Sequence, residues 1–208
     1  MPRMFDAQIR PIIDPVLNAQ GRVLARLGFT ANQITLIGLG LGLLACGLIA
    51  AGESLWALLP LLVSRLADGL DGAVARARGG TDFGGYLDIT CDFLFYGAVP
   101  FAFVVADPAA NGLAGTFLLL SFYVNGTSFL GFALLADRHG LKSAARGKKA
   151  LYFTGGLLEG TETIAFLVLL CLLPQAFAPM AWVFGGLCFL TAASRVLLAW
   201  RSFQDKGQ

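Results

Sequence analysis

Charged residues are scarce in this chain, and their scarcity indicates whether the protein is soluble or membrane-bound. Asp, Glu, Lys and Arg together account for 13% of the 208 residues, whereas 57% are hydrophobic. Soluble domains carry about a quarter of their residues as charges. The excess of apolar residues is more than a core of this size can bury, so the composition excludes a soluble globular domain. It predicts an all-α integral membrane protein, since helices satisfy their own backbone groups in lipid.

Other signals are also missing. The first 33 residues lack the apolar stretch of a cleavable signal peptide. The four cysteines show no metal-ligand spacing, and no internal repeat is evident. The formal net charge of +2 gives no support for a nucleic-acid partner, and we expect none.

Apolar segments long enough to cross a bilayer occur six times, at about 20 residues per crossing. They are Ile34–Ala51, Ser54–Ala73, Gly84–Ala106, Gly112–Ala136, Thr154–Leu173 and Met180–Trp200. We therefore expect a six-helix transmembrane domain over 34–201 and a tail over 202–208. Residues 1–33 mix apolar and charged residues as an amphipathic interfacial segment does. Because Pro11 and Pro15 interrupt this segment, it is predicted to form two short pieces on the inner leaflet.

Basic residues are distributed on one side only. Lys and Arg occur before the first segment, around the second connection, in the fourth connection and at the C-terminal end. The second group includes Arg65, Arg76 and Arg78. The intervening loops "GES", "DPAANG" and "PQAFAP" contain none. The positive-inside rule then predicts that both termini and the aspartate-rich second connection are cytoplasmic, in an inner or plasma membrane.

Five aspartates crowd into "DGLDGAVARARGGTDFGGYLDITCD", residues 68–92. Asp68 and Asp71 are three residues apart, and Asp88 and Asp92 are four apart, so each pair occupies one helical face. Consecutive spans joined by a short loop run antiparallel. A rise of 1.5 Å per residue then places all four roughly 5–12 Å below the cytoplasmic edge. We expect these four carboxylates to share one pocket.

Such a cluster is costly in a membrane unless a cation binds it. Hard divalent ions prefer oxygen ligands, and two ions a few ångströms apart can hold a diphosphate. Gly69 and Gly72 remove side chains beside the aspartates and would let a ligand approach the backbone. Arg76 follows one turn later, where it could meet a phosphate.

The spacing resembles the signature of the CDP-alcohol phosphotransferase family, D-x2-D-G-x2-A-R-x7/8-G-x3-D-x3-D. All eight fixed positions match, at Asp68, Asp71, Gly72, Ala75, Arg76, Gly84, Asp88 and Asp92. "TANQIT", residues 30–35, is similar to the T-P-N-x-x-T segment of that family, with Ala31 where proline is usual.

The resemblance implies an enzyme that moves a phosphatidyl group from CDP-diacylglycerol to the hydroxyl of a small polar alcohol and releases CMP, in phospholipid biosynthesis. Asp68, Asp71 and Asp88 would hold two Mg²⁺ or Mn²⁺ ions. Asp92 would be the general base and could also be a metal ligand. The CDP donor would be bordered by Gly72, Ala75 and Arg76. The family also suggests a homodimer.

The acceptor alcohol stays open, among glycerol phosphate, inositol phosphate, serine, choline and others. Acceptor-binding candidates are Glu159, Glu162, Arg195 and Lys148. Arg195 could bind an acceptor phosphate or pair with one of the glutamates. The polar residues Ser121, Asn125 and Ser128 on the fourth segment could serve helix packing or acceptor binding. "GKKAL", residues 147–151, departs from the G-K-x-K-T run of the glycerol-phosphate branch.

Two other functions compete with this interpretation. A membrane prenyltransferase also binds a diphosphate through aspartates, but it would show more spans and two widely separated motifs. An ion or proton transporter could use buried carboxylates. Transporters often carry inverted repeats and broken mid-membrane helices, whereas here the charges gather at one end of the spans. Release of CMP from CDP-diacylglycerol would separate the three functions.

Overall fold

The protein is a bundle of long α-helices. The computed structural model describes residues 5–139 and 160–203, which are almost wholly helical and contain no strand. The helices are α1 Phe5–Arg26, α2 Ala31–Ala50, α3 Ser54–Arg78, α4 Asp82–Ala106, α5 Pro108–Arg138, α7 Gly160–Leu172, the 3₁₀ turn η2 Pro174–Ala176 and α8 Phe177–Phe203. Helices α2, α3, α4, α5 and α8 overlap five of the predicted apolar segments, and α7 overlaps the described part of the fifth segment.

Among the described residues, four helical segments could cross a membrane by length and composition: α2, α4, α5 and the continuous stretch of η2 and α8. Helix α3 carries charges through its second half, and the described part of α7 is 13 residues long. The all-helical membrane fold is therefore confirmed, while six crossings stay a prediction.

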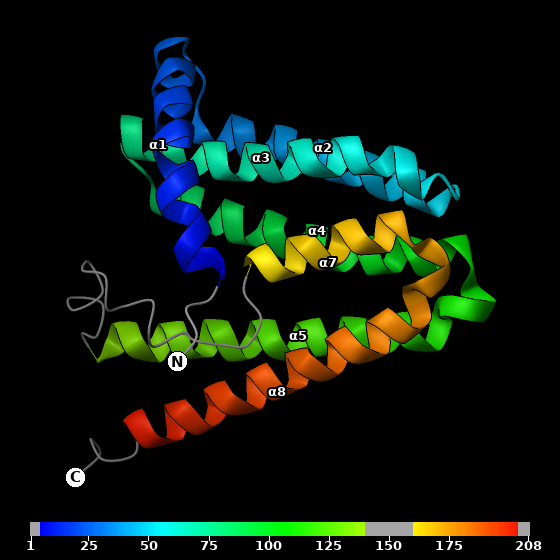
Figure 1. Cartoon of the computed structure of the whole chain (residues 1–208). Helices are drawn as coiled ribbons and strands as arrows, with labels where there is room; N and C mark the ends of the chain where they lie inside the picture. The colour runs from blue at the N-terminus through cyan, green and yellow to red at the C-terminus, as the bar shows by residue number, and fades with distance from the viewer. Residues whose placement is uncertain (1–4, 140–159, 204–208) are drawn as a thin grey trace.

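The helices run back and forth between two ends of the bundle (Figure 1). The turns from α2 to α3, from α4 to α5 and from α7 to α8 gather at one end. The α3–α4 turn, helix α1 and the C-terminal end of α8 lie at the other end. Helix α2 packs against both α3 and α4, and α5 packs against α8. The three loops without basic residues, "GES", "DPAANG" and "PQAFAP", therefore lie at the same end of the bundle (Figure 1). The predicted orientation in the membrane requires this arrangement.

Local sequence sets where the helices start. Thr30 and Gln33 form a capping box at the start of α2, in which the Thr30 N–H donates to Gln33 Oε1 at 2.9 Å. At α4, the Thr81 hydroxyl accepts a hydrogen bond from the Gly84 N–H at 3.0 Å. Such caps satisfy backbone donors that a helix start leaves unpaired. The "TANQIT" segment therefore owes part of its pattern to helix capping.

The apolar core fills the half of the bundle with the short turns. Ile49, Leu61, Phe103, Leu118 and Phe177 are fully buried there, and the rings of Phe103 and Phe177 stack at 4.9 Å. The opposite half holds a smaller apolar cluster of Ile34, Ala67 and Val74. It also buries polar side chains, namely Thr35, Ser64, Asp71 and Arg195. Large apolar side chains also cover the outside, with Trp56 73% and Leu113 77% exposed, as a surface facing lipid requires.

Helix α1 corrects one expectation. The two prolines were predicted to split the N-terminal segment, but Phe5–Arg26 is a single helix through Pro11 and Pro15. The prolines are four residues apart, so the backbone hydrogen bonds they remove lie along one side of the helix. Tertiary packing holds the rest: the Gly21 backbone lies directly on Ala73 of α3, where an added Cβ would come within 2.6 Å of the Ala73 Cβ. Packing against α3 thus keeps the segment in one helix, although the two prolines disfavour it.

Candidate active site

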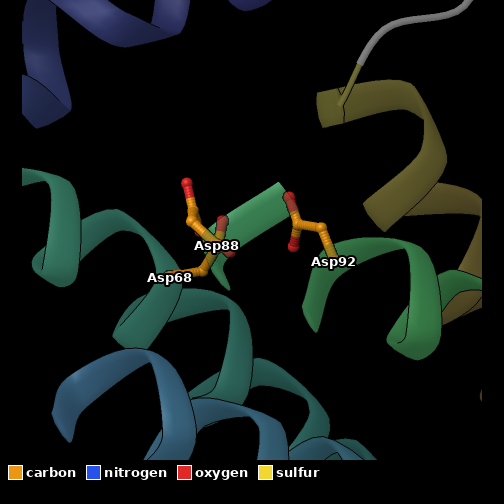
Figure 2. A group of neighbouring side chains, drawn as sticks. All are labelled: Asp68, Asp88 and Asp92. Atoms are coloured by element: carbon orange, nitrogen blue, oxygen red, sulfur yellow. The ribbon is translucent and has the colours of Figure 1, made fainter. Parts of the chain in front are cut away.

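Helices α3 and α4 each contribute two of the predicted aspartates, one turn apart. Helix α3 ends at Arg78 and is capped by Gly79, whose φ of +92° favours glycine, and α4 begins at Asp82 after a short connection. Because α2 packs against both helices, α3 and α4 are held on either side of a space. The side chains of Asp68, Asp88 and Asp92 extend into that space (Figure 2).

Three of the aspartates form a group that could hold a metal ion. Asp68, Asp88 and Asp92 each offer one carboxylate oxygen, and these oxygens lie within 4.8 Å of one another. All three side chains are half-buried. An all-oxygen donor set of this kind suits a hard divalent ion such as Mg²⁺ or Mn²⁺, and an ion would offset the repulsion among the carboxylates. The residues present therefore fit the predicted metal.

Asp71 differs from the other three. It is 4% exposed, and its Oδ2 accepts a hydrogen bond of 2.6 Å from the Thr35 hydroxyl of α2. It lies outside the three-carboxylate group but borders, with Asp68 and Asp92, a cavity of about 10 Å³. Three of the four carboxylates expected to share a pocket thus form one group, and Asp71 lies beside two of them while bonded to Thr35 of α2. Thr35 was missed as a site residue, although it is the last residue of "TANQIT".

Arg65 is the main residue that sequence reasoning missed. It was counted among the basic residues that set topology, but its side chain is 8% exposed inside the bundle. Its Nη1 lies 2.9 Å from Asp92 Oδ1 and 3.5 Å from Asp68 Oδ1. The signal that could have revealed it is the spacing: Arg65 precedes Asp68 by three residues and shares its helical face.

The two glycines beside the aspartates have different surroundings. A Cβ on Gly69 would meet Leu17 of α1 at 3.0 Å, so α1 covers the face that we predicted to be open to a ligand. A Cβ on Gly72 would meet Arg76 Nη1 at 3.3 Å. Gly72 therefore leaves room for a guanidinium group. The sequence could not show the contact between Gly69 and Leu17, because the position of α1 depends on tertiary packing.

Of the residues predicted to border the CDP donor, Gly72 and Ala75 are half-buried and Arg76 is exposed. The Arg76 Nε donates a hydrogen bond of 3.0 Å to Asn18 Oδ1 of α1. Asn18 was not predicted, and no sequence pattern indicates it. Helix α1 therefore forms a wall beside the second half of α3 and orients the one arginine of the signature.

Arg195 of α8 is buried, at 5% exposure, and bonds to α5. Its Nη1 donates to the Asn125 carbonyl at 3.1 Å, to Asn125 Oδ1 at 3.0 Å and to Ser128 Oγ at 2.7 Å. The neighbouring Gly126 lies against the Phe93 ring of α4, next to Asp92. The polar residues of the fourth segment thus link α5 to α8, and they place Arg195 at about the level of the aspartates.

The remaining acceptor candidates are placed only in part. Glu162 is half-buried in the first turn of α7 and interacts with neighbouring groups. Glu159 and Lys148 lie outside the described residues.

Comparison with known proteins decides the family. A model of the CDP-alcohol phosphatidyltransferase family matches residues 29–197, which is most of the chain and includes every aspartate of the signature. The chain belongs to this family. It is therefore a phosphotransferase enzyme of the type that acts in phospholipid biosynthesis, and the prenyltransferase and transporter alternatives lose their basis.

Individual relatives agree with this assignment. The chain is 49% identical over 193 residues to the inner membrane protein YnjF of Escherichia coli, covering 93% of this chain and 94% of that protein. It is 31% identical over 188 residues to a phosphatidylinositol phosphate synthase of Mycobacteroides abscessus, covering 89% and 81% of the two chains. Together with its apolar helices, these likenesses make it a multi-pass membrane protein.

A solved structure shares the fold. The Mycobacterium tuberculosis phosphatidylinositol phosphate synthase with CDP-DAG bound superposes with a TM-score of 0.72 at 23% identity, covering 93% of this chain and 98% of that one. A second structure of that synthase, in complex with manganese and citrate, has a TM-score of 0.67 at 24% identity.

Proposed function

We propose that this enzyme moves a phosphatidyl group from CDP-diacylglycerol to the hydroxyl of a small polar alcohol and releases CMP. The observation that carries the proposal is the group of three carboxylates between α3 and α4, whose oxygens lie within 4.8 Å of one another. They occupy signature positions of a family whose reaction runs at a diphosphate. The mycobacterial structure with CDP-DAG bound supports the choice of donor.

Two Mg²⁺ or Mn²⁺ ions are the proposed cofactor. Asp68, Asp71, Asp88 and Asp92 would hold them, with Asp71 oriented by Thr35. When bound, the ions would neutralise the diphosphate and stabilise the charge that develops on the departing CMP. Manganese in the mycobacterial synthase supports this assignment.

The nucleotide would lie along the second half of α3. Gly72 and Ala75 would border it, and Arg76 would contact its phosphate. Arg76 is exposed and held at its Nε by Asn18, which leaves its two terminal nitrogens to donate to phosphate oxygens.

Asp92 is the proposed general base. The acceptor hydroxyl oxygen forms a bond to the phosphorus that carries diacylglycerol, while the bond from that phosphorus to the CMP oxygen breaks. Asp92 takes the hydroxyl proton in the same step. The products are the phosphatidyl alcohol and CMP.

The predicted topology completes the proposal. Residues 34–201 would form six transmembrane helices, with the amphipathic segment 1–33 and the tail 202–208 in the cytoplasm. Helix α1 and the last turn of α3 both carry basic residues and lie at the same end of the bundle (Figure 1). By the positive-inside rule, the active site at that end would face the cytoplasm. The enzyme would function as a homodimer, as its family suggests.

A phosphorylated polyol is the proposed acceptor. Relatives from Mycobacteroides and Corynebacterium, 31% and 30% identical, are phosphatidylinositol phosphate synthases. A buried arginine needs oxygen partners, and Arg195 keeps its guanidinium near the level of Asp92. Arg195 and Lys148 would contact the acceptor phosphate, and Glu159 and Glu162 would contact its hydroxyls.

The test uses purified protein in lipid nanodiscs with CDP-diacylglycerol, Mg²⁺ or Mn²⁺, and a panel of inositol phosphate, glycerol phosphate, inositol and serine. CMP release with a phosphorylated polyol is expected, and absence of CMP release with every alcohol would refute the transferase proposal. Arg195→Ala should raise the acceptor KM about tenfold or more, as expected for a charged contact, while the KM for CDP-diacylglycerol stays unchanged. Arg201→Ala, an exposed arginine on the same helix, is the matched control. An unchanged acceptor KM in folded Arg195→Ala would favour a neutral alcohol.

A further inference from the structure

Arg65 is a cation built into the aspartate cluster. It stands one helical turn before Asp68 on α3, on the side of the bundle core. One of its nitrogens, Nη1, lies 2.9 Å from Asp92 Oδ1 and 3.5 Å from Asp68 Oδ1. It thus touches two of the three carboxylates whose oxygens could hold a metal ion.

The scaffold holds this arginine in place independently of any ion. Its guanidinium carbon lies 3.9 Å from the centre of the Phe95 ring and 5.6 Å from that of Tyr96. Nη2 donates to Ser64 Oγ at 3.2 Å, while Nε has no acceptor among the described residues. A guanidinium buried to this extent depends on the anions at Nη1 to offset its desolvation. The aspartates and Arg65 therefore stabilise each other.

The contact also makes the two carboxylate oxygens of Asp92 unequal. Oδ1 accepts the hydrogen bond from Arg65, which leaves its second lone pair and both lone pairs of Oδ2 for an ion or a proton. A hydrogen bond to a buried, ring-stacked arginine fixes the carboxylate more firmly than a bond to a mobile surface chain would. The orientation of the proposed base is thus set from inside the bundle.

We propose that Arg65 is a positioning residue that orients Asp92 and lowers the affinity of the aspartate cluster for divalent ions. This inference rests on the proposed function of the four aspartates. Its positive charge repels a divalent ion bound by the same carboxylates, and its hydrogen bond keeps Asp92 aligned. Removal of the charge should therefore strengthen metal binding while slowing the reaction.

A purely structural arginine would behave differently. If Arg65 only stabilised the fold, its loss would disorder the carboxylates, and metal affinity and turnover would fall together. The direction of the change in metal affinity therefore distinguishes the two roles.

The experiment measures Mn²⁺ binding by the loss of the free-ion electron paramagnetic resonance signal, in nanodiscs without substrate. Arg65→Gln removes the charge but can still donate a hydrogen bond, and Arg65→Lys keeps the charge but loses the planar group. Arg138→Gln, at an exposed arginine in the last turn of α5, is the matched control. CMP release is measured on the same preparations.

Arg65→Gln should bind Mn²⁺ about tenfold more tightly, since a unit positive charge is removed within a few ångströms of the ion. Its kcat should fall about tenfold or more, because misalignment of a catalytic group is costly. Arg65→Lys should keep the Mn²⁺ Kd within about threefold of the wild type, since its charge remains, but should also lose kcat. Arg138→Gln should leave the Kd unchanged.

Weaker or unchanged Mn²⁺ binding by folded Arg65→Gln would overturn the positioning role while leaving the metal site intact. If Arg65→Gln does not fold, Arg65→Lys decides, because full kcat in that variant would also overturn the role. Absence of Mn²⁺ binding by the wild type would instead overturn the metal site itself, and the role of Arg65 with it.

Discussion

The hydroxyl of Thr35 on α2 lies 2.6 Å from Oδ2 of Asp71 on α3. The same hydroxyl is 3.1 Å from the carbonyl of Ala31, but its single hydrogen serves the shorter contact with the carboxylate better. A residue on one helix thus orients a signature aspartate on another. Asp71 lies outside the group of three carboxylates but lines the same small cavity as Asp68 and Asp92.

Removal of this hydroxyl tests whether the orientation of Asp71 matters. Thr35→Val keeps the side-chain shape but cannot donate, so CMP release should fall about tenfold or more, as for other residues that orient metal ligands. Thr116→Val is the control, because its exposed hydroxyl donates to the Gly112 carbonyl of its own helix. Equal turnover in the two variants would show that Asp71 needs no help from α2.

Loss of a carboxylate should weaken metal binding at the site. Asp68→Ala and Asp88→Ala each remove one of three grouped oxygens, so CMP release should disappear and Mn²⁺ binding should weaken. Asp82→Ala is the control, since Asp82 is exposed in the first turn of α4. Ordinary activity in either test variant would remove that aspartate from the site.

The Asp92→Asn variant tests whether Asp92 acts as the general base or chiefly as a metal ligand. The amide oxygen can still accept the hydrogen bond from Arg65, which preserves the local structure. It cannot take a proton, so kcat should fall by at least about 10²-fold, the low end for acid–base catalysis. The Kd for CDP-diacylglycerol should change much less. Equal losses of binding and turnover would mean that Asp92 acts chiefly as a metal ligand.

The packing of α1 can be tested without substrate. In Gly21→Val, the new Cβ would come within 2.8 Å of the Ala73 backbone carbon, so α1 must move away from α3. The free energy of unfolding should fall by about 1–3 kcal/mol, as in other overpacked sites. Ala19→Val is the control, because Ala19 is exposed on the same helix. Thermal unfolding in nanodiscs measures both, and an unchanged Tm for Gly21→Val would contradict the close contact.

Sidedness can be read from single introduced cysteines, because the four native ones are buried. Ala110→Cys and Gln175→Cys, at exposed positions near the α4–α5 and α7–α8 turns, should react with an impermeant thiol reagent from outside the cell. Gly80→Cys, in the exposed α3–α4 connection, should react only after the membrane is opened. Labelling of Gly80→Cys in intact cells would reverse the orientation and place the active site on the outer face.

The sequence by itself determined the helices and the chemistry of the signature. Apolar length set the positions of α2 to α8 to within a few residues at most ends, and Thr30 and Thr81 set helix starts through their side chains. The spacing of Asp68, Asp88 and Asp92 placed each on the correct helical face. These features depend on contacts within one helix or on its length, which the local sequence contains.

Only the tertiary structure decided which faces meet. Helices that are apolar on every side carry no clear phase to show which face turns inward. The burial of Arg65 between the aspartates and Phe95, the turn of Asp71 toward Thr35 and the covering of Gly69 by Leu17 all depend on how α1, α2, α3 and α4 rotate against one another. That rotation results from close packing of side chains far apart in the sequence. It brings the charged side chains of α3 and α4 together in one site.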